Sequence, residues 1–375
     1  FIIYLVHTME KLELGLKLIT QLNQKGYEAY IIGGAVRDYI LNLPISDVDI
    51  CTNALPEEVS LVFPLVMNEG DSYLSCRVVL EDETFEVTTF RKDICYLDHR
   101  HPQTIQTNSL KEDVLRRDFT MNAIAMDANK RLIDYCDGIK DIKQQKIVMI
   151  GDPKIRFEED GLRVLRALDF SSRLNFDLDE AILKSLDQDY VGYLHEEMII
   201  TMLEKLFSNP YLNRLAIIKE YQLLKAFPVY QVIAEEAIDA GIRDIYAYFF
   251  VKHGFFPSNL KLPKKIALEA VLVGNIVKNE LDNYSLFKEN IEICKKALVL
   301  SNSVHHTTLD ENWLMKRYEE LPIHSLKDIA FDFNELQAPK RAIAQNLVTR
   351  AILAGKLVNL KQWITKYLEN EGILS

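Results

Sequence analysis

The chain has 375 residues, of which 48% are hydrophobic and 26% are charged, and this ordinary globular composition excludes an intrinsically disordered protein. Its formal net charge of −11 excludes a protein that coats nucleic acid by general basicity, although a local basic face can still bind a nucleic acid. The five cysteines form no CxxC motif, which gives no sign of a disulfide framework or a zinc site and favours a cytoplasmic location.

Helix and strand patterns alternate through the first part of the chain. The apolar run 1–6 is much shorter than the roughly 20 residues that span a bilayer, so we expect no membrane association. Residues 9–26 carry apolar side chains at helical spacing and end on a glycine suited to terminate a helix. Further along, short apolar or alternating runs predict strands. The predicted strands are 30–32, 48–51, 76–80 and 84–90, and the predicted helices between them begin at residues 35 and 56.

The second part of the chain has a different character. Residues 91–109 show neither the periodicity of a helix nor that of a strand. They predict a long loop, which in a compact domain is usually functional. From about residue 155 helical patterns dominate to the end. We therefore predict an α+β fold, in which a domain with a mixed β-sheet is followed by three all-helical parts. The predicted boundaries are 10–145 for the sheet domain and 146–210, 211–310 and 311–375 for the helical parts.

Two glycines, Gly33 and Gly34, come directly after the strand predicted at 30–32. Glycines at such a position let the backbone approach a phosphate closely, and the N-terminus of the next helix favours an anion. Arg37 lies one turn into that helix, where its guanidinium can clamp phosphate oxygens. A glycine pair by itself is more often only a turn, so a phosphate site here needs support from residues further along the chain.

A pair of carboxylates provides that support. Asp47 and Asp49 are two residues apart at a predicted strand, so we expect both side chains on one face. Like charges so placed repel each other unless a cation lies between them, and Mg²⁺ takes one or two carboxylates together with substrate phosphates. Glu86, on the next predicted hairpin, is a candidate third carboxylate. The plainer alternatives are a solvated strand end for the pair and an exposed strand position for Glu86.

A second group of charged residues recurs at helical spacing. Asp160, Arg163 and Arg166 are three residues apart and are expected to form one polar stripe on a helix, beside a stripe of leucines. A carboxylate accepts a hydrogen bond from an exocyclic amine, which cytosine and adenine carry on their Watson–Crick edge, and a guanidinium donates to a ring nitrogen or carbonyl. Asp160 and Arg163 could therefore read an incoming base, each good contact being worth about 1–3 kcal/mol. A salt-bridged helix surface is the plainer alternative.

Together these motifs resemble one protein family. The segments 33–38 (GGAVRD) and 47–49 (DVD) are similar to the head of class II tRNA nucleotidyltransferases, which are the CCA-adding enzymes and the bacterial poly(A) polymerases. The segments 116–123 (RRDFTMNA) and 156–167 (RFEEDGLRVLRA) extend the resemblance over roughly residues 10–210. The remainder is more loosely similar to the shorter enzymes of Gram-positive-type bacteria. The resemblance implies that the four parts are a catalytic nucleotidyltransferase head, a nucleotide-selecting neck, a body and a tRNA-binding tail.

The resemblance implies addition and repair of the 3′-terminal CCA of tRNA from CTP and ATP without a nucleic-acid template. The RNA 3′-hydroxyl attacks the α-phosphate and pyrophosphate leaves, with two Mg²⁺ ions on Asp47 and Asp49 and with Glu86 as an auxiliary catalytic carboxylate. The loop at 91–109 is expected to couple to the switch from C to A addition. The residues expected to bind the nucleotide are Gly33, Gly34, Arg37, Arg117, Asn122, Asp160, Arg163 and Arg166. The residues expected to contact tRNA are Lys340, Arg341, Arg350, Lys356 and Lys361, and a homodimer is left open.

The sequence departs from the family pattern at two positions in the neck. Asp169 stands where the family usually has an arginine, so we expect it either to weaken triphosphate binding or to pair with Arg166 or Arg173. After Leu194 the usual Ser-x-Glu-Arg pattern ends instead on Met198, so one neck arginine is missing.

Other functions stay open at this point. A bacterial poly(A) polymerase, a CC-adding enzyme and an A-adding enzyme would share the motifs, although the acidic segment 369–371 disfavours the basic tail common in the polymerases. A catalytically weakened RNA-binding homologue is suggested by Asp169 and Met198, but the intact aspartate pair argues against it. The chain contains no His-Asp dipeptide, which argues against an appended HD-type phosphohydrolase.

Overall fold

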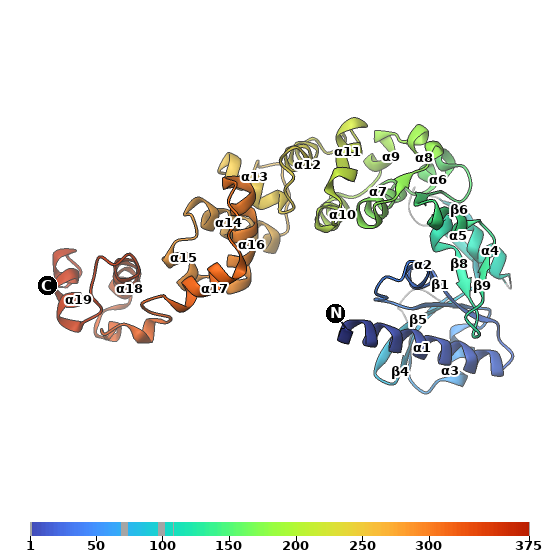
Figure 1. Ribbon diagram of the computed structural model, residues 1–375, viewed down its shortest axis with the longest axis horizontal. Coiled ribbons are helices and arrows are strands. Elements are labelled where there is room, and N and C mark those ends of the chain that lie inside the picture. Colours follow the sequence, from blue (N-terminus) through green and yellow to red (C-terminus); the bar gives the residue numbers. More distant parts are fainter. Residues whose placement is uncertain (1, 69–73, 97–101, 108, 375) are drawn as a thin grey trace. The chain divides into compact units, whose positions relative to one another are not determined.

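The computed structural model describes residues 2–68, 74–96, 102–107 and 109–374 (Figure 1). The chain divides into two compact units, one extending to Pro228 and the other from Val229 to the C-terminus. The first unit combines a β-sheet with helices and the second is built of helices, so the predicted α+β fold is confirmed. The finer division into four parts stays a prediction.

The core of the first unit is a seven-stranded mixed sheet. Its strand order is β3-β4-β5-β2-β1-β8-β9, and every neighbouring pair is antiparallel except β2 and β5. Alternating burial along β5 shows why a run of Thr, Phe and Val forms a strand with one face on the core. The strands are β1 (Ala29–Ile32), β2 (Asp49–Thr52), β3 (Val66–Asn68), β4 (Ser75–Leu80), β5 (Glu83–Thr89), β8 (Ile124–Met126) and β9 (Leu132–Asp134).

Helices surround this sheet. The first helix, α1 (Ile2–Gln24), buries Leu12, Leu16, Ile19 and Leu22 as its spacing predicts, although it begins earlier than residue 9. A Cβ atom at Gly15 would lie 2.7 Å from the side chain of Val48, so a glycine is needed where α1 crosses the chain leading into β2. The other helices of this domain are α2 (Gly34–Ile40), α3 (Pro56–Val62), α4 (Leu110–Leu115), η1 (Thr120–Asn122) and α5 (Gly138–Lys143).

The prediction of a structureless loop at 91–109 is wrong for the residues that the structure describes. They form a separate antiparallel pair of strands, β6 (Arg91–Tyr96) and β7 (Pro102–Gln106), with an irregular register between Asp93 and Cys95. Residues 97–101 and 108 of the predicted loop lie outside the described part of the chain. The pattern is missed because Arg91, Lys92 and Asp93 are three charged residues in a row, which removes the alternation that marks a strand.

The helical segment after the sheet is organised around α7 (Leu162–Leu174). Its predicted apolar stripe is buried, with Leu162, Leu165 and Leu168 at most 8% exposed. A short parallel pair, β10 (Lys146–Ile147) and β11 (Asp177–Leu178), lies at its end. The neighbouring elements are α6 (Pro153–Glu159), α8 (Glu180–Ser185), α9 (Gln188–Gly192), α10 (Glu196–Ser208), η2 (Leu212–Leu215) and α11 (Ala216–Glu220).

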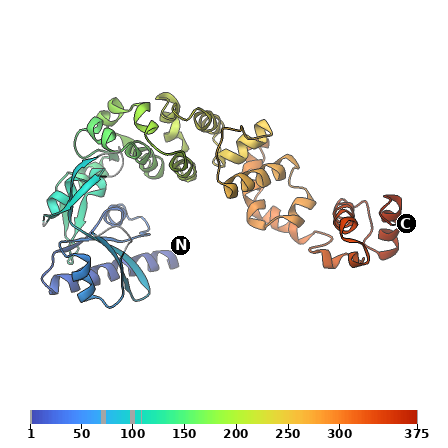
Figure 2. The ribbon, with the colours of Figure 1, turned by 180° about the vertical axis from the view of Figure 1, so that it is seen from behind.

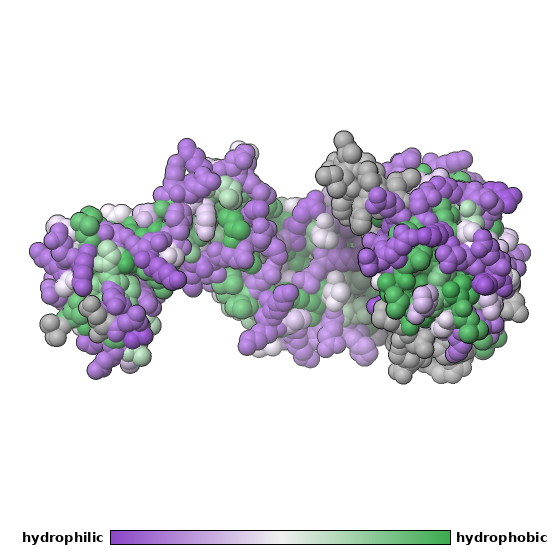
Figure 3. All heavy atoms as spheres, turned by 90° about the horizontal axis from the view of Figure 1, so that it is seen from below, coloured by the Kyte–Doolittle hydropathy of each residue, from purple (hydrophilic) through white to green (hydrophobic). Residues whose placement is uncertain are grey.

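All regular elements in the described part of the second unit are helices (Figure 2). Proline marks the first turn of α12 and α18, as expected for a residue that lacks an amide hydrogen. Hydrophilic residues cover most of the face of this unit drawn in Figure 3. Among the described residues, no helix has the length and apolar character needed to cross a membrane. Its helices are α12 (Pro228–Ala240), α13 (Ile245–His253), α14 (Lys264–Lys278), α15 (Asn283–Lys288), α16 (Ile291–His305), α17 (Glu311–Glu319), η3 (Leu326–Asp328), η4 (Phe333–Glu335), α18 (Ala338–Leu353) and α19 (Lys361–Asn370).

Candidate active site

The glycine pair stands at the junction of β1 and α2, as predicted. Gly33 has φ 81° and ψ −136°, a conformation that favours glycine, and α2 begins at the next residue. A Cβ atom at Gly33 would lie 3.4 Å from Asp49 Oδ2 and 3.8 Å from Arg117 Nη1. The end of β1 therefore meets a carboxylate from β2 and a guanidinium from the segment after α4.

The two aspartates do not share a strand, which corrects the prediction. Asp49 is the first residue of β2 and pairs with Ile32, the last residue of β1, so Asp47 falls in the preceding loop, where its side chain is 82% exposed. The Nζ atom of Lys11 lies 3.8 Å from Asp47 Oδ1. Asp49 is exposed as a residue, but partial desolvation of its carboxyl raises its pKa. The charge of Asp47 raises that pKa further, against the opposing charges of Arg117 and Lys11. The two carboxylates thus lie close enough to repel each other.

Glu86 lies on the strand beside Asp49. It comes one residue before Val87 of β5, which pairs with Ile50 of the parallel strand β2, and its side chain is exposed. In the part of the chain that the structure describes, no three His, Cys, Asp or Glu side chains converge closely enough to hold a metal ion. Glu86 as a third member of the cluster therefore stays a prediction.

Arg37 is buried and fully engaged beside the glycines. Its guanidinium donates to both carboxylate oxygens of Asp38, at 2.8 and 2.9 Å, and to Asn122 Oδ1 at 2.6 Å. A Cβ atom at Gly34 would lie 3.5 Å from the same guanidinium. Burial lowers the pKa of Arg37, and the charge of Arg173 adds to this effect, while Asp38 opposes it. The structure thus brings together Gly34, Arg37 and Asn122, three of the predicted nucleotide-binding residues.

Asp118 connects this group to α7. Its carboxylate accepts hydrogen bonds from Arg166 Nε at 2.7 Å and from Asn122 Nδ2 at 3.4 Å. Burial alone would raise the pKa of Asp118, but the hydrogen bonds from Arg166, the Phe119 amide and Asn122, with the charge of Arg166, hold it below its usual value. Asp118 therefore orients Arg166 by an ion pair.

Arg117 is held by a residue that the sequence patterns did not lead us to predict. Asp113 of α4 is fully buried and accepts hydrogen bonds from Arg117 Nη2 at 3.1 Å, Arg116 Nε at 3.0 Å and the Arg91 amide at 3.2 Å. The signal was present, because an acidic residue three and four positions before two arginines is a helical ion-pair pattern. Asp113 therefore orients Arg117 toward Gly33 and ties the β6–β7 ribbon to the site.

The predicted polar stripe on one helix is wrong in part. Asp160 ends α6 in an extended conformation, outside α7, and its Oδ1 accepts the Leu162 amide at 3.0 Å. Arg163 is buried in α7, where its Nη1 donates to the Arg156 carbonyl at 2.8 Å and to Glu159 Oε2 at 2.9 Å. The helical path is interrupted at Asp160, and at the next residue a Cβ atom on Gly161 would lie 2.0 Å from the Tyr190 carbonyl oxygen. Close packing against α9 thus overrides the continuous helical pattern.

The partner of Asp169 also differs from expectation. Asp169 is 1% exposed and forms an ion pair with Lys205 Nζ of α10 at 2.8 Å, not with Arg166 or Arg173. Asn209 Nδ2 donates to Asp169 Oδ1 at 3.0 Å. The side chain therefore joins α7 to α10. Met198, the other departure from the family pattern, lies half-buried in the first turn of α10.

We expect the substitution Lys205→Met to destabilise the first unit, because it leaves the buried Asp169 carboxylate without a cation. Lys205 is itself half-exposed, so we discount the full cost of breaking a buried pair and expect a fall in the thermal unfolding midpoint of about 2–4 °C. The matched control is Lys184→Met, which removes an exposed pair with Glu180 and should shift the midpoint by less than about 1 °C. Equal shifts would contradict a structural role for the Asp169 pair.

Comparison with known proteins places this site in a family. Residues 29–148 match the poly A polymerase head domain. A CCA-adding enzyme of Bacillus licheniformis is 34% identical, over 95% of this chain and 97% of its own length, and one of Bacillus subtilis is 33% identical, over 97% and 100%. The crystal structure of the Bacillus stearothermophilus CCA-adding enzyme in complex with CTP aligns with a TM-score of 0.82 at 30% identity, over 95% and 96% of the two chains.

The sheet domain and the glycine and carboxylate motifs that it carries define a nucleotidyltransferase of the poly A polymerase type. Within that class, the chain belongs to the CCA-adding enzymes and is a CCA tRNA nucleotidyltransferase. A Thermotoga maritima CCA-adding enzyme complexed with tRNA has the same fold, with a TM-score of 0.63 at 16% identity. The resemblance drawn from the motifs is therefore confirmed.

Proposed function

We propose that this enzyme adds and repairs the 3′-terminal CCA of tRNA, using CTP and ATP and releasing pyrophosphate. The observation that carries the proposal is the meeting of Gly33, Asp49 and Arg117 at the end of β1. A phosphate-binding turn, a metal-binding carboxylate and a fixed guanidinium are the groups that nucleotidyl transfer requires. We further propose that the protein acts in the cytoplasm, which its free cysteines Cys51, Cys76, Cys136 and Cys294 support.

The aspartate pair fits a divalent cation. Asp47 and Asp49 repel each other in the absence of a cation, and Mg²⁺ needs only one or two carboxylates where substrate phosphates and water supply its other ligands. We propose that they hold two Mg²⁺ ions. These ions would supply activation of the attacking hydroxyl and neutralisation of the leaving pyrophosphate.

The remaining residues bind and orient the nucleotide. We assign triphosphate binding to the backbone at Gly33 and Gly34, with the Arg37 guanidinium packed against that turn, and Asn122 keeps Arg37 in place. Arg117 stands between Asp113 and Asp49, where it contributes positive charge beside the reacting phosphate. Because these groups are fixed before substrate binds, catalysis rests on positioning and electrostatics and needs no protein nucleophile.

Base selection is assigned to Asp160 and Arg163. Arg163 Nη1 donates to Glu159 and to the Arg156 carbonyl, and these two acceptors hold the guanidinium that we assign to the base edge. Asp160 lies in the non-helical link between α6 and α7, which gives its carboxylate a position outside the regular helix. Arg166 then holds the start of α7 against the head through Asp118.

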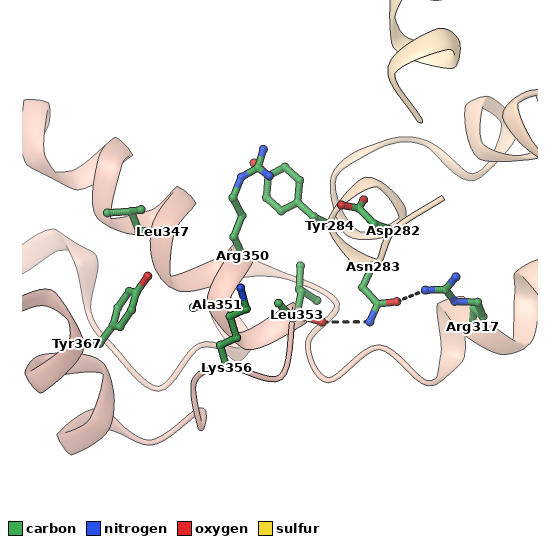
Figure 4. Close-up of a pocket in the computed structure, with 11 residues that line it drawn as sticks. Asp282, Asn283, Tyr284, Arg317, Leu347, Arg350, Ala351, Leu353, Lys356 and Tyr367 are labelled. Atoms are coloured by element: carbon green, nitrogen blue, oxygen red, sulfur yellow. Dashed lines mark hydrogen bonds between the residues drawn. The ribbon is translucent and has the colours of Figure 1, made fainter. Parts of the chain in front are cut away.

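A pocket in the second unit is our candidate for tRNA contact. It has a volume of about 550 Å³ and includes Arg350 and Lys356, two of the five predicted contacts, together with Arg317. The Arg350 guanidinium lies over the ring of Tyr284, 3.8 Å from its centre (Figure 4). Basic groups beside aromatic rings suit an RNA backbone with an unstacked base.

The other predicted tRNA contacts are more weakly supported. Lys340 Nζ donates to the Ile373 carbonyl at 2.9 Å and Arg341 Nη2 to the Leu336 carbonyl at 3.1 Å. Both groups thus fasten segments of the second unit to each other. Lys361, at the start of α19, does not line the pocket.

We expect the double variant Arg350→Gln/Lys356→Gln to raise the Kd for tRNA about tenfold and to lower the salt dependence of binding, because it removes two phosphate-binding charges. The rate at saturating tRNA should stay unchanged, since the nucleotide site lies in the first unit. The matched control is Lys264→Gln/Lys265→Gln, which removes two exposed charges of α14 outside the pocket. Equal effects of the two double variants on tRNA affinity would show that only general charge matters.

The function itself is tested with defined tRNA ends. Transcripts lacking CCA, CA or only the final A are incubated with Mg²⁺ and CTP, ATP or both. Complete CCA addition predicts CMP incorporation into the first two and AMP incorporation into the third. Arrest after two cytidines, addition of the final adenosine alone, or a long adenosine tract would instead identify a CC-adding enzyme, an A-adding enzyme or a poly(A) polymerase.

A further inference from the structure

Three guanidinium groups surround one aromatic ring at the junction of the sheet domain and α7. Phe170 of α7 is 6% exposed, and its ring centre lies 5.3 Å from the Arg37 guanidinium carbon, 5.6 Å from that of Arg166 and 4.9 Å from that of Arg173. At these distances a ring attracts a cation. Phe119 packs edge-on against the same ring at 5.5 Å, which fixes its position.

The three arginines differ in how their charge is balanced. Arg37 pairs with Asp38, and Arg166 pairs with Asp118. The Nε atom of Arg173 is buried and has no hydrogen-bond partner within the described part of the chain. Arg173 also lies close enough to Arg37 for the two positive charges to repel each other. A buried donor without a partner and crowded positive charge are both costly, and an anion between the guanidiniums would relieve both.

The position of this arginine group defines the kind of anion. The Arg37 guanidinium covers Gly34, at the turn to which we assign phosphate binding. Arg173 comes two turns after Arg166 on α7, so the group extends from the glycine turn along the helix. All three guanidinium carbons lie within 5.6 Å of the Phe170 ring centre, so the phosphates that follow one bound at the turn would come within reach of Arg173.

We propose that Arg173 binds the pyrophosphate portion of the incoming CTP or ATP, and that Phe170 is a positioning residue that holds the three guanidiniums for it. This inference rests on the proposed nucleotide site and adds to it the group that contacts the leaving phosphates. A guanidinium suits this task because its planar fork gives two charge-assisted hydrogen bonds to phosphate oxygens.

The test compares nucleotides that differ only in phosphate number. Equilibrium binding of CTP and CMP to the full chain is measured in Mg²⁺ for the native protein and for Arg173→Gln. We expect the Kd for CTP to rise about tenfold, as for the loss of one charge-assisted contact, and the Kd for CMP to change less than about twofold. The matched control is Arg214→Gln, which removes an arginine that bonds to Asn175 and Asp177 and should leave both Kd values unchanged.

Phe170 is tested by the ratio of the two affinities, because a purely structural role would not change it. Phe170→Leu should lower the preference for CTP over CMP as Arg173→Gln does, and Phe170→Tyr, which keeps the ring, should restore it. The proposal is overturned if Arg173→Gln weakens CTP and CMP equally, or leaves CTP binding unchanged. Failure of the proposed function is seen separately, in a native protein that does not extend tRNA ends.

Discussion

Replacing Asp49 by alanine should lower the rate of CMP incorporation into tRNA about a thousandfold, which is about 4 kcal/mol of transition-state stabilisation. The Asp49 carboxylate lies beside both the glycine turn and Arg117, so its loss would remove the metal ligand that we propose at the reacting phosphate. Its folding role is small, because its side chain faces the site and its backbone pairing with Ile32 does not depend on it. The measurement is single-turnover incorporation with saturating CTP and tRNA.

The control for this variant is another carboxylate of the same unit. Glu180→Gln removes an exposed acidic group that pairs with Lys184, and it should leave the rate unchanged. Asp47→Ala should also abolish most of the activity, although Asp47 is exposed and Lys11 lies beside it. If an active preparation of either aspartate variant kept its Mg²⁺-dependent incorporation, the assignment of that aspartate as a metal ligand would be wrong.

Local patterns in the sequence were sufficient to predict the strand and the helix on either side of the glycine pair. A buried strand with two glycines directly after it predicts the turn at Gly33, because both signals lie within a few residues. The approach of Arg117 to that turn could not be predicted in this way. It depends on the pairing of β1 with β8 and on the buried ion pair with Asp113, and the strand pairing joins residues far apart in the sequence.

The corrections have a common physical origin in tertiary packing. The chain from Asp160 to Arg166 reads as continuous helix, yet Asp160 is extended, and the next residue, Gly161, packs so closely on the Tyr190 carbonyl that only a glycine fits there. Asp169 could reach several arginines on its own helix, yet its side chain is buried against α10, where Lys205 supplies the cation. Propensity and spacing describe one element at a time, and such contacts between elements override them.

The broken helix leads to the second prediction, which concerns the choice of base. We expect Asp160→Ala to lower the preference for CTP over UTP by about 10–100-fold, because a base-reading contact is worth about 1–3 kcal/mol. Uracil carries a carbonyl where cytosine carries the amine that would donate to Asp160. The loss should therefore fall on CMP incorporation, while the slow incorporation of UMP stays unchanged or rises. The ratio of kcat/KM for the two nucleotides measures this directly.

We expect Arg163→Ala to lower the preference for CTP over UTP as well, because the Arg163 guanidinium would donate to the cytosine ring nitrogen or carbonyl. Because Arg163 also binds Glu159, the control must separate base reading from loss of that contact. Glu159→Gln keeps Arg163 and weakens its anchor, together with the ion pair between Glu159 and Arg156. It should retain most of the preference for CTP, whereas Arg163→Ala should lose it. If Asp160→Ala and Arg163→Ala lowered the rates with CTP and UTP by the same factor, these residues would position the nucleotide without reading its base, and selection would have to reside elsewhere in the site.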